Sequence, residues 1–130
     1  MAGEKDLARL IGGMAPVLFG EPWGFALAPD DFVPGPDDFA LIREAEGLTL
    51  IAPVVRLEAM GLDPGVPMAR ISLGVHSALE AVGLTAAVAG ALAEAGVSAN
   101  VLAGFFHDHI FVPWEDRAAA MVVLEGLAGA

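Results

Sequence analysis

The chain of 130 residues contains no cysteine, and it has only six lysines and arginines against 17 aspartates and glutamates. The absence of cysteine excludes disulfide bonds, thiolate metal sites and a cysteine nucleophile. The formal net charge of -11 repels phosphate backbones and anionic lipid head groups, so it argues against nucleic acid and membrane surfaces as partners. The longest uncharged apolar stretch, Ala81–Ala93, is shorter than the roughly 20 residues of a membrane-spanning helix.

The beginning of the chain also lacks a targeting signal. Residues Met1–Arg9 mix charged and apolar side chains and contain no apolar run of the kind that a signal peptide needs. We therefore expect a cytoplasmic protein without a membrane segment.

Apolar residues, by contrast, are abundant. They make up 56% of the chain, whereas charged residues make up 18%. The length suits one domain or at most two small lobes. Because a small domain has much surface and this chain has few charges to cover it, we expect part of the apolar surface to face another lobe or a second subunit.

Proline, glycine and hydrophobic periodicity divide the first half into short elements. We expect a helix at Leu7–Ile11, a strand at Trp23–Ala28, a hairpin of Phe39–Arg43 with Leu48–Ala52, and a short helix from Pro53 to Met60. The segment Gly61–Pro67 holds two prolines and two glycines, which are typical of a linker. It predicts a boundary between a first lobe of residues 1–65 and a second lobe of residues 66–130.

The second half has the order strand, helix, strand, strand, helix. The predicted elements are Ala69–Val75, Gly83–Ala95, the hairpin of Ser98–Phe106 with His109–Val112, and a helix from Pro113 to near Ala128. The helix that begins at Gly83 has almost no charged face, so we expect it to be covered on both sides. A strand, a proline and a helix also follow one another in the first half, which suggests two related lobes.

Three motifs of the second half are similar to those of a known domain family. They are Glu80-x-x-Gly83-Leu84 at the end of a strand, Gly96-Val-x-x-Asn100 at the entry to the next strand, and Asp108-x-Ile-x-Val112 in the hairpin. Together they resemble the ACT domain, and above all the small tandem-ACT proteins related to the aspartokinase regulatory region and to CASTOR-type arginine sensors. Residues 43–50 of the first half look like the N-terminal lobe of that family.

The resemblance implies an α+β fold of two ferredoxin-like lobes, with antiparallel sheets, helices on one face, and a degenerate N-terminal lobe. It also implies a homodimer that binds a small molecule, typically an amino acid, without catalysing a reaction and without a cofactor. The family plan ends with a fourth strand, whereas the last predicted element here is a helix. The missing edge strand is supplied by the other lobe, by Trp23–Ala28 or by a second subunit.

Gly83 is the centre of the predicted ligand site. Glycine lets a ligand approach the backbone, and the free N–H groups of a helix start attract a carboxylate. The resemblance implies that the main chain of residues 82–84 holds the carboxylate of an amino acid, while Asp108 and Glu80 hold its ammonium or a basic side chain. The predicted ligand-binding residues are Glu80, Val82, Gly83, Leu84, Asn100 and Asp108.

Each of these assignments has a structural alternative. Gly83 also suits a tight strand-to-helix turn that needs no ligand, and Asp108 also suits a hairpin turn that it caps with its own side chain. Ser77-x-x-Glu80 has the form of a capping box, but this would place Gly83 inside the helix at a cost of about 1 kcal/mol. We therefore prefer a helix that begins at Gly83.

The histidines leave a catalytic interpretation open. His107 and His109 flank Asp108, and His76 lies elsewhere in the chain. A tight turn would prevent the two flanking rings from sharing a face, so we expect no metal site. An acid–base pair of Asp108 with one of the histidines is the catalytic alternative to a regulatory ligand-binding protein. An oligomerisation module with a vestigial pocket is the third possibility.

The aromatic residues are expected to be structural. The basic residues that nucleic acid requires are scarce. We therefore expect the rings of Phe105, Phe106 and Phe111 to pack in the core and at an interface, and not to form a platform on which bases stack. Trp23 and Trp114 are expected to anchor the fold.

Overall fold

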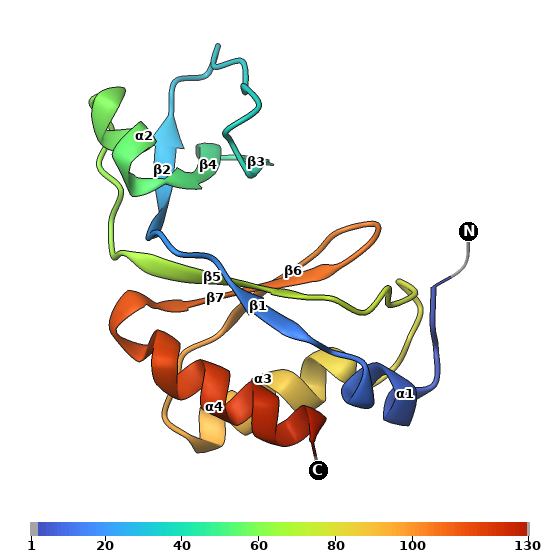
Figure 1. The fold of residues 1–130 in the computed structure, drawn as a ribbon. Helices are drawn as coiled ribbons and strands as arrows, with labels where there is room; N and C mark the ends of the chain where they lie inside the picture. The colour runs from blue at the N-terminus through green and yellow to red at the C-terminus, as the bar shows by residue number, and fades with distance from the viewer. Residues whose placement is uncertain (1–2, 130) are drawn as a thin grey trace. The chain divides into compact units, whose positions relative to one another are not determined.

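The chain folds into two compact units that interleave along the sequence. In a computed structural model, which describes residues 3–129, the larger unit combines the N-terminal segment up to Phe19 with all residues from Ala69 onward. The smaller unit is the inserted segment Gly20–Met68. Figure 1 shows the elements of both units. No helix within residues 3–129 is long and apolar enough to cross a membrane.

The larger unit contains a four-stranded sheet. Its strands are β1 (Pro16–Leu18), β5 (Met68–Leu73), β6 (Asn100–Ala103) and β7 (Asp108–Pro113). They lie in the order β1, β5, β7, β6, with β1 antiparallel to β5 and β6 antiparallel to β7. The helices α3 (Leu84–Glu94) and α4 (Arg117–Ala128) cover one face of this sheet, and the short helix α1 (Leu7–Gly12) lies beside them (Figure 1). A single 3₁₀ turn, Trp114–Asp116, joins β7 to α4.

The core of this unit follows from residue spacing. Alternate residues of β5 and β7 point at the helices, and α3 buries every fourth residue along one stripe. The buried side chains are Ala69, Ile71 and Leu73 on β5, Ile110 and Val112 on β7, Leu84, Val88 and Leu92 on α3, and Ala120 and Leu124 on α4. Burying one such leucine or isoleucine stabilises the fold by roughly 1.5–3 kcal/mol.

The outer face of α3 is exposed within this chain. Ala86, Gly90 and Ala93 lie there, on the side opposite the buried stripe. The expectation that this helix is covered on both sides is therefore not met by the rest of the chain. Within residues 3–129 the helix packs against α1 and α4 and shares its core with the sheet.

The edge strand that was missing from the second half comes from the first half. It is β1, in which Val17 pairs with Ser72 of β5. Residues Trp23–Ala28, the second of the three expected sources, form β2 and pair along their whole length with another strand of the smaller unit. With β1 in place, the sheet and its two helices have the ferredoxin-like arrangement that was predicted.

The packing units do not coincide with the expected lobes of residues 1–65 and 66–130. Leu10 of α1 and Met14 are fully buried in the core of the larger unit. Because these two side chains bury their apolar surface against the second half of the chain, the first 19 residues fold with it and not with their sequence neighbours.

The smaller unit is the degenerate lobe. It consists of β2 (Trp23–Ala28), β3 (Ala40–Glu44), β4 (Gly47–Pro53) and the six-residue helix α2 (Val54–Ala59), with the strands in the order β3, β4, β2. Leu50 and Leu57 are fully buried in its core. Arg56 of α2 holds the loop before β3, because its Nη2 lies 3.0 Å from Oδ2 of Asp38. That hydrogen bond holds the pKa of Asp38 below its usual value.

A cross-strand disulfide tests the position of β1. In the double variant Val17→Cys/Ser72→Cys, the two cysteines stand directly opposite each other. We expect a disulfide within one chain that stabilises the fold by about 2–4 kcal/mol. Non-reducing electrophoresis and thiol titration detect it without background, since the chain has no other cysteine.

The matched control is Val17→Cys/Leu102→Cys. Leu102 lies on β6, at the opposite edge of the same sheet, so this pair should stay reduced within one chain. Equal cross-linking of both pairs would contradict the strand order.

Candidate functional site

The candidate site lies where β5 leads into α3 and where β7 begins. A cavity of about 110 Å³ opens there, entirely within the larger unit. It is lined by Ser77, Ala78, Leu79, Ala81, Gly83, Leu84, Thr85, Ala103 and Asp108. Three of the predicted ligand-binding residues, Gly83, Leu84 and Asp108, are therefore brought together.

Gly83 is the residue from which α3 begins. Its φ of +103° lies in the left-handed region that favours glycine, and an added Cβ would come within 3.1 Å of Leu7. Its carbonyl accepts the first helical hydrogen bond from Ala87. No side chain caps the helix, so the backbone N–H groups of the first turn are available to a ligand or to water.

The capping box is not formed. The hydroxyl of Ser77 donates to the carbonyl of Ala78 at 3.3 Å, and Glu80 pairs with Lys5 instead of turning toward the helix. The helix begins directly after Gly83, in agreement with the sequence analysis, which preferred a helix start at Gly83 to a capping box at Ser77.

Asp108 is the acid that faces this helix start across the cavity. It is the first residue of β7 and stands opposite Ala103 of β6. Burial raises the pKa of its half-buried carboxyl, against the weaker effect of His107. Within residues 3–129 its side chain makes no hydrogen bond or ion pair, so it does not cap the hairpin turn. The turn is closed by the backbone bond from Gly104 to His107.

The remaining predicted site residues lie away from this cavity. The carboxylate of Glu80 is 2.9 Å from Nζ of Lys5, and this contact lowers the pKa of Glu80. Val82 is 82% exposed and does not line the cavity. Asn100 lies on β6, where its amide donates to the carbonyl of Phe111 at 3.4 Å. Roles for Glu80, Val82 and Asn100 stay predictions.

The histidines have partners of their own. The Nδ1 atom of His109 lies 2.8 Å from the hydroxyl of Ser72, and that of His107 lies 3.3 Å from the carbonyl of Val75. Burial, assisted by Arg70 and His107, lowers the pKa of His109 to about 4. In the part of the chain that the structure describes, no three side chains are grouped in a way that could hold a metal ion.

Sequence reasoning missed the N-terminal support of the site. The Glu4 N–H donates to the carbonyl of His76, and the Ala78 N–H donates to the carbonyl of Glu4, at 2.8 and 3.0 Å. Gly3 approaches so closely that an added Cβ would lie 2.5 Å from the nitrogen of Ala78. Residues 3–4 and 76–78 contact each other through main-chain atoms, which leave no pattern of side chains in the sequence. Gly3 is the one residue whose type indicates this contact.

The substitution Asp108→Asn tests whether Asp108 is a site residue or a structural one. Folding raises the pKa of this carboxyl above 3.8, so the ionised form opposes folding at every pH above that range. We expect the variant to be as stable as the parent at pH 7 or up to about 1 kcal/mol more stable, because solvent screens a half-buried charge. The difference in free energy of unfolding between variant and parent should vanish near pH 3, where the carboxyl is protonated in both the folded and the unfolded chain.

Urea unfolding at the two pH values measures this, with the exposed Asp31→Asn as the control. A loss of more than about 1 kcal/mol in Asp108→Asn at pH 7 would show that the carboxylate has a structural partner.

Acidification provides a second test, through His109. Its pKa is about 4 in the folded protein and 6.5 ordinarily, so the unfolded chain binds the proton more readily. The contribution of His109 to the free energy of unfolding is therefore fully present above pH 6.5 and falls progressively toward pH 4. The variant His109→Asn has no imidazole to protonate. Between pH 7 and pH 4 its free energy of unfolding should therefore fall by about 1–2 kcal/mol less than that of the parent, after allowance for solvent exposure. Identical pH profiles of the free energy of unfolding for parent and variant would contradict the burial of a neutral ring.

Comparison with known proteins places the chain in a family. Two models of the ACT domain match it, one over residues 2–69 and the other over residues 68–126. The two matches meet close to the expected boundary in chain order, although the packing units differ from it. Among proteins with curated descriptions, none matches this chain.

Solved structures agree with the family assignment. A Vibrio cholerae protein of unknown function, described as a possible transport protein, is 40% identical, with a TM-score of 0.79 over 95% of this chain and 97% of that one. A protein from Agrobacterium tumefaciens shares 18% identity and a TM-score of 0.65 over 83% of this chain and 84% of that one. The ligand-free regulatory subunit of aspartate kinase from Thermus thermophilus shares 13% identity and a TM-score of 0.63 over 88% of this chain and 97% of that one. The last two show the fold alone. With two ACT segments in tandem, the chain belongs to the ACT-domain family.

Proposed function

We propose that the protein is a non-catalytic regulatory protein that binds a free amino acid in the cavity between Gly83 and Asp108. The observation that carries the proposal is the pairing of an uncapped helix start with an unpartnered carboxylate on the walls of one cavity. An amino acid carries a carboxylate and an ammonium group on one carbon, so it offers each wall the charge that the wall lacks.

The two ends of the ligand have different partners. The N–H groups at the beginning of α3, at Leu84 and Thr85, receive the carboxylate, and the partial positive charge of the helix N-terminus favours it there. Asp108 receives the ammonium. A cationic group beside Asp108 lowers its raised pKa again, so the bound ligand removes the cost of burying that charge.

The size of the cavity limits what it holds. At about 110 Å³ it is smaller than the roughly 300–1,000 Å³ typical of sites that enclose a whole drug-sized ligand. It suits the amino and carboxylate groups of an amino acid, and the rest of such a ligand lies outside it.

Its relatives support a regulatory role. One of the solved structures that share the fold is a regulatory subunit of aspartate kinase. The more similar Vibrio cholerae protein is described only as a possible transport protein, and a ligand-binding role is compatible with that description as well.

Binding of the 20 amino acids tests the proposal directly. At 100 times its dissociation constant, a ligand that binds only the folded protein stabilises it by about 2.7 kcal/mol. We expect at least one amino acid to raise the melting temperature by this mechanism. Asp108→Asn should weaken its binding at least tenfold in calorimetric titration.

The control variant Asp31→Asn makes the same charge change at an exposed residue of the smaller unit, which does not line the cavity, and should bind as the parent does. If no amino acid shifts the melting temperature, or if Asp108→Asn binds as tightly as the parent, the proposal fails.

We also propose that the protein is a homodimer that uses the outer face of α3. This face is exposed and uncharged at Ala86, Gly90 and Ala93, which suits close packing of a second helix. Sedimentation of the parent should give twice the mass of the chain, and Ala86→Glu should give the mass of one chain. A control at an exposed glutamate of the same helix, Glu94→Gln, should stay dimeric, and a monomeric parent would end the proposal.

A further inference from the structure

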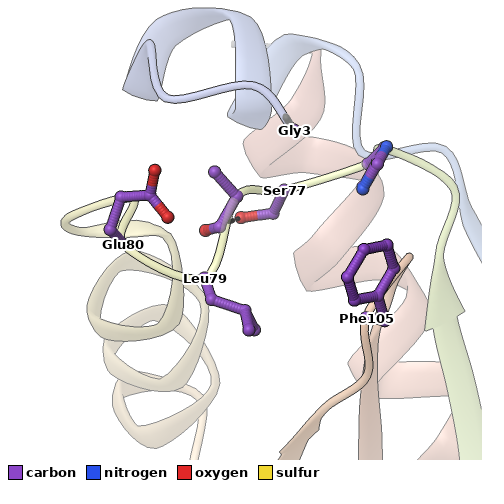
Figure 2. Close-up of a pocket in the computed structure, with 7 residues that line it drawn as sticks. Gly3, Ser77, Leu79, Glu80 and Phe105 are labelled. Carbon is purple, nitrogen blue, oxygen red and sulfur yellow. Dashed lines mark hydrogen bonds between the residues drawn. The ribbon is translucent and has the colours of Figure 1, made fainter. Parts of the chain in front are cut away.

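A second cavity adjoins the one that Asp108 lines. Its volume is about 120 Å³, and its walls are Gly3, His76, Ser77, Ala78, Leu79, Glu80 and Phe105. It shares Ser77, Ala78 and Leu79 with the first cavity, so both cavities border this segment. Figure 2 shows Leu79 pointing toward Phe105, with Glu80 on the side away from the ring.

Exposed apolar side chains gather around this second cavity. Leu79 and Phe105 are 69% and 62% exposed, and the neighbouring Phe106 is 57% exposed. Of the three rings expected in the core or at an interface, Phe105 and Phe106 thus lie outside the core, whereas Phe111 is fully buried. The two exposed rings meet edge to face at 5.0 Å, and the ring of His76 lies 5.6 Å from that of Phe106. Apolar surface exposed beside a cavity is typical of a ligand-binding groove.

The wall of this cavity offers no unpaired charge to a ligand. Glu80 is its only acid, and its carboxylate is already paired with Lys5 at 2.9 Å. Asp108, the unpartnered acid, lines the first cavity and not the second. A charged ligand side chain would therefore have to break an existing ion pair or enter an apolar space without a partner.

The backbone around the cavity is fixed in place. Two backbone hydrogen bonds of Glu4 hold residues 76–78, and Gly3 lies against the main chain of Ser77 and Ala78. The cavity therefore exists before a ligand arrives, which reduces the entropic cost of binding.

We propose that this second cavity is the side-chain subsite of the amino-acid site and that it selects a medium-sized aliphatic side chain, such as that of leucine, isoleucine, valine or methionine. The proposal rests on the proposed function, because the first cavity has to hold the amino and carboxylate groups. A cavity of about 150 Å³ in another protein holds benzene, so about 120 Å³ suits an aliphatic group better than a phenyl ring. Each methylene buried there should strengthen binding about fourfold.

Calorimetric titration of the full chain with leucine, methionine, alanine, glycine, lysine and aspartate tests the selection. We expect leucine or methionine to bind at least tenfold more tightly than alanine or glycine, and lysine and aspartate to bind more weakly than leucine. Phe105, which lines the second cavity and not the first, is the residue to change: Phe105→Ala should weaken leucine binding at least fivefold while changing alanine binding by less than twofold.

The side chain of Phe105 is largely exposed, so the variant should fold, and its melting curve establishes this before titration. The matched control is Val33→Ala, at an apolar residue of the smaller unit that is 82% exposed. It should leave the affinities for leucine and alanine unchanged.

The possible outcomes separate the two proposals. If alanine and leucine bind equally, and Asp108→Asn weakens both while Phe105→Ala weakens neither, the amino-acid site stands and the side-chain subsite is wrong. Binding of no amino acid at all overturns both. If Phe105→Ala converts a dimer into a monomer and leaves the affinity for leucine unchanged, the apolar side chains serve an interface between copies and the subsite is again wrong.

Discussion

The pairing of β1 with β5 is the contact on which the larger unit depends. It places a strand from the beginning of the chain at the edge of a sheet built from the end of the chain, and it brings Leu10 and Met14 into the core beneath α3 and α4. The same N-terminal segment then continues outward to Gly3 and Glu4, which hold the loop between β5 and α3. The edge of the sheet and the wall of the candidate site are therefore supported by one stretch of chain.

The candidate site is electrostatically incomplete. Three acids elsewhere in residues 3–129 have a basic partner: Asp38 pairs with Arg56, Glu80 with Lys5 and Glu4 with Arg9. At the cavity, a helix start without a cap faces a carboxylate that burial has made harder to ionise. Natural proteins rarely keep such an arrangement for stability alone, since an ordinary N-cap residue stabilises a helix by about 1 kcal/mol.

Much of this could be predicted from sequence. Hydrophobic spacing and Gly83 predicted a helix at Gly83–Ala95, and the structure has α3 at Leu84–Glu94. The pattern around Asp108 predicted a hairpin, and the structure has one. What the sequence could not show depends on pairing at a distance: β1 has three residues and no periodicity, and Gly3 matters only because of the backbone that lies against it. The sequence also could not show which of the three phenylalanines expected in the core or at an interface are buried, because composition does not tell a core ring from an exposed one.

The interleaved order of the larger unit has a consequence for how the protein is made. During synthesis β1 leaves the ribosome before its partner β5, and the whole smaller unit is translated between them. The N-terminal segment thus stays without its partner until the smaller unit has been translated, and the core closes only after α4 has emerged. Such long-range pairing slows folding, so chaperones that hold the early segment matter more here than for two lobes that fold one after the other.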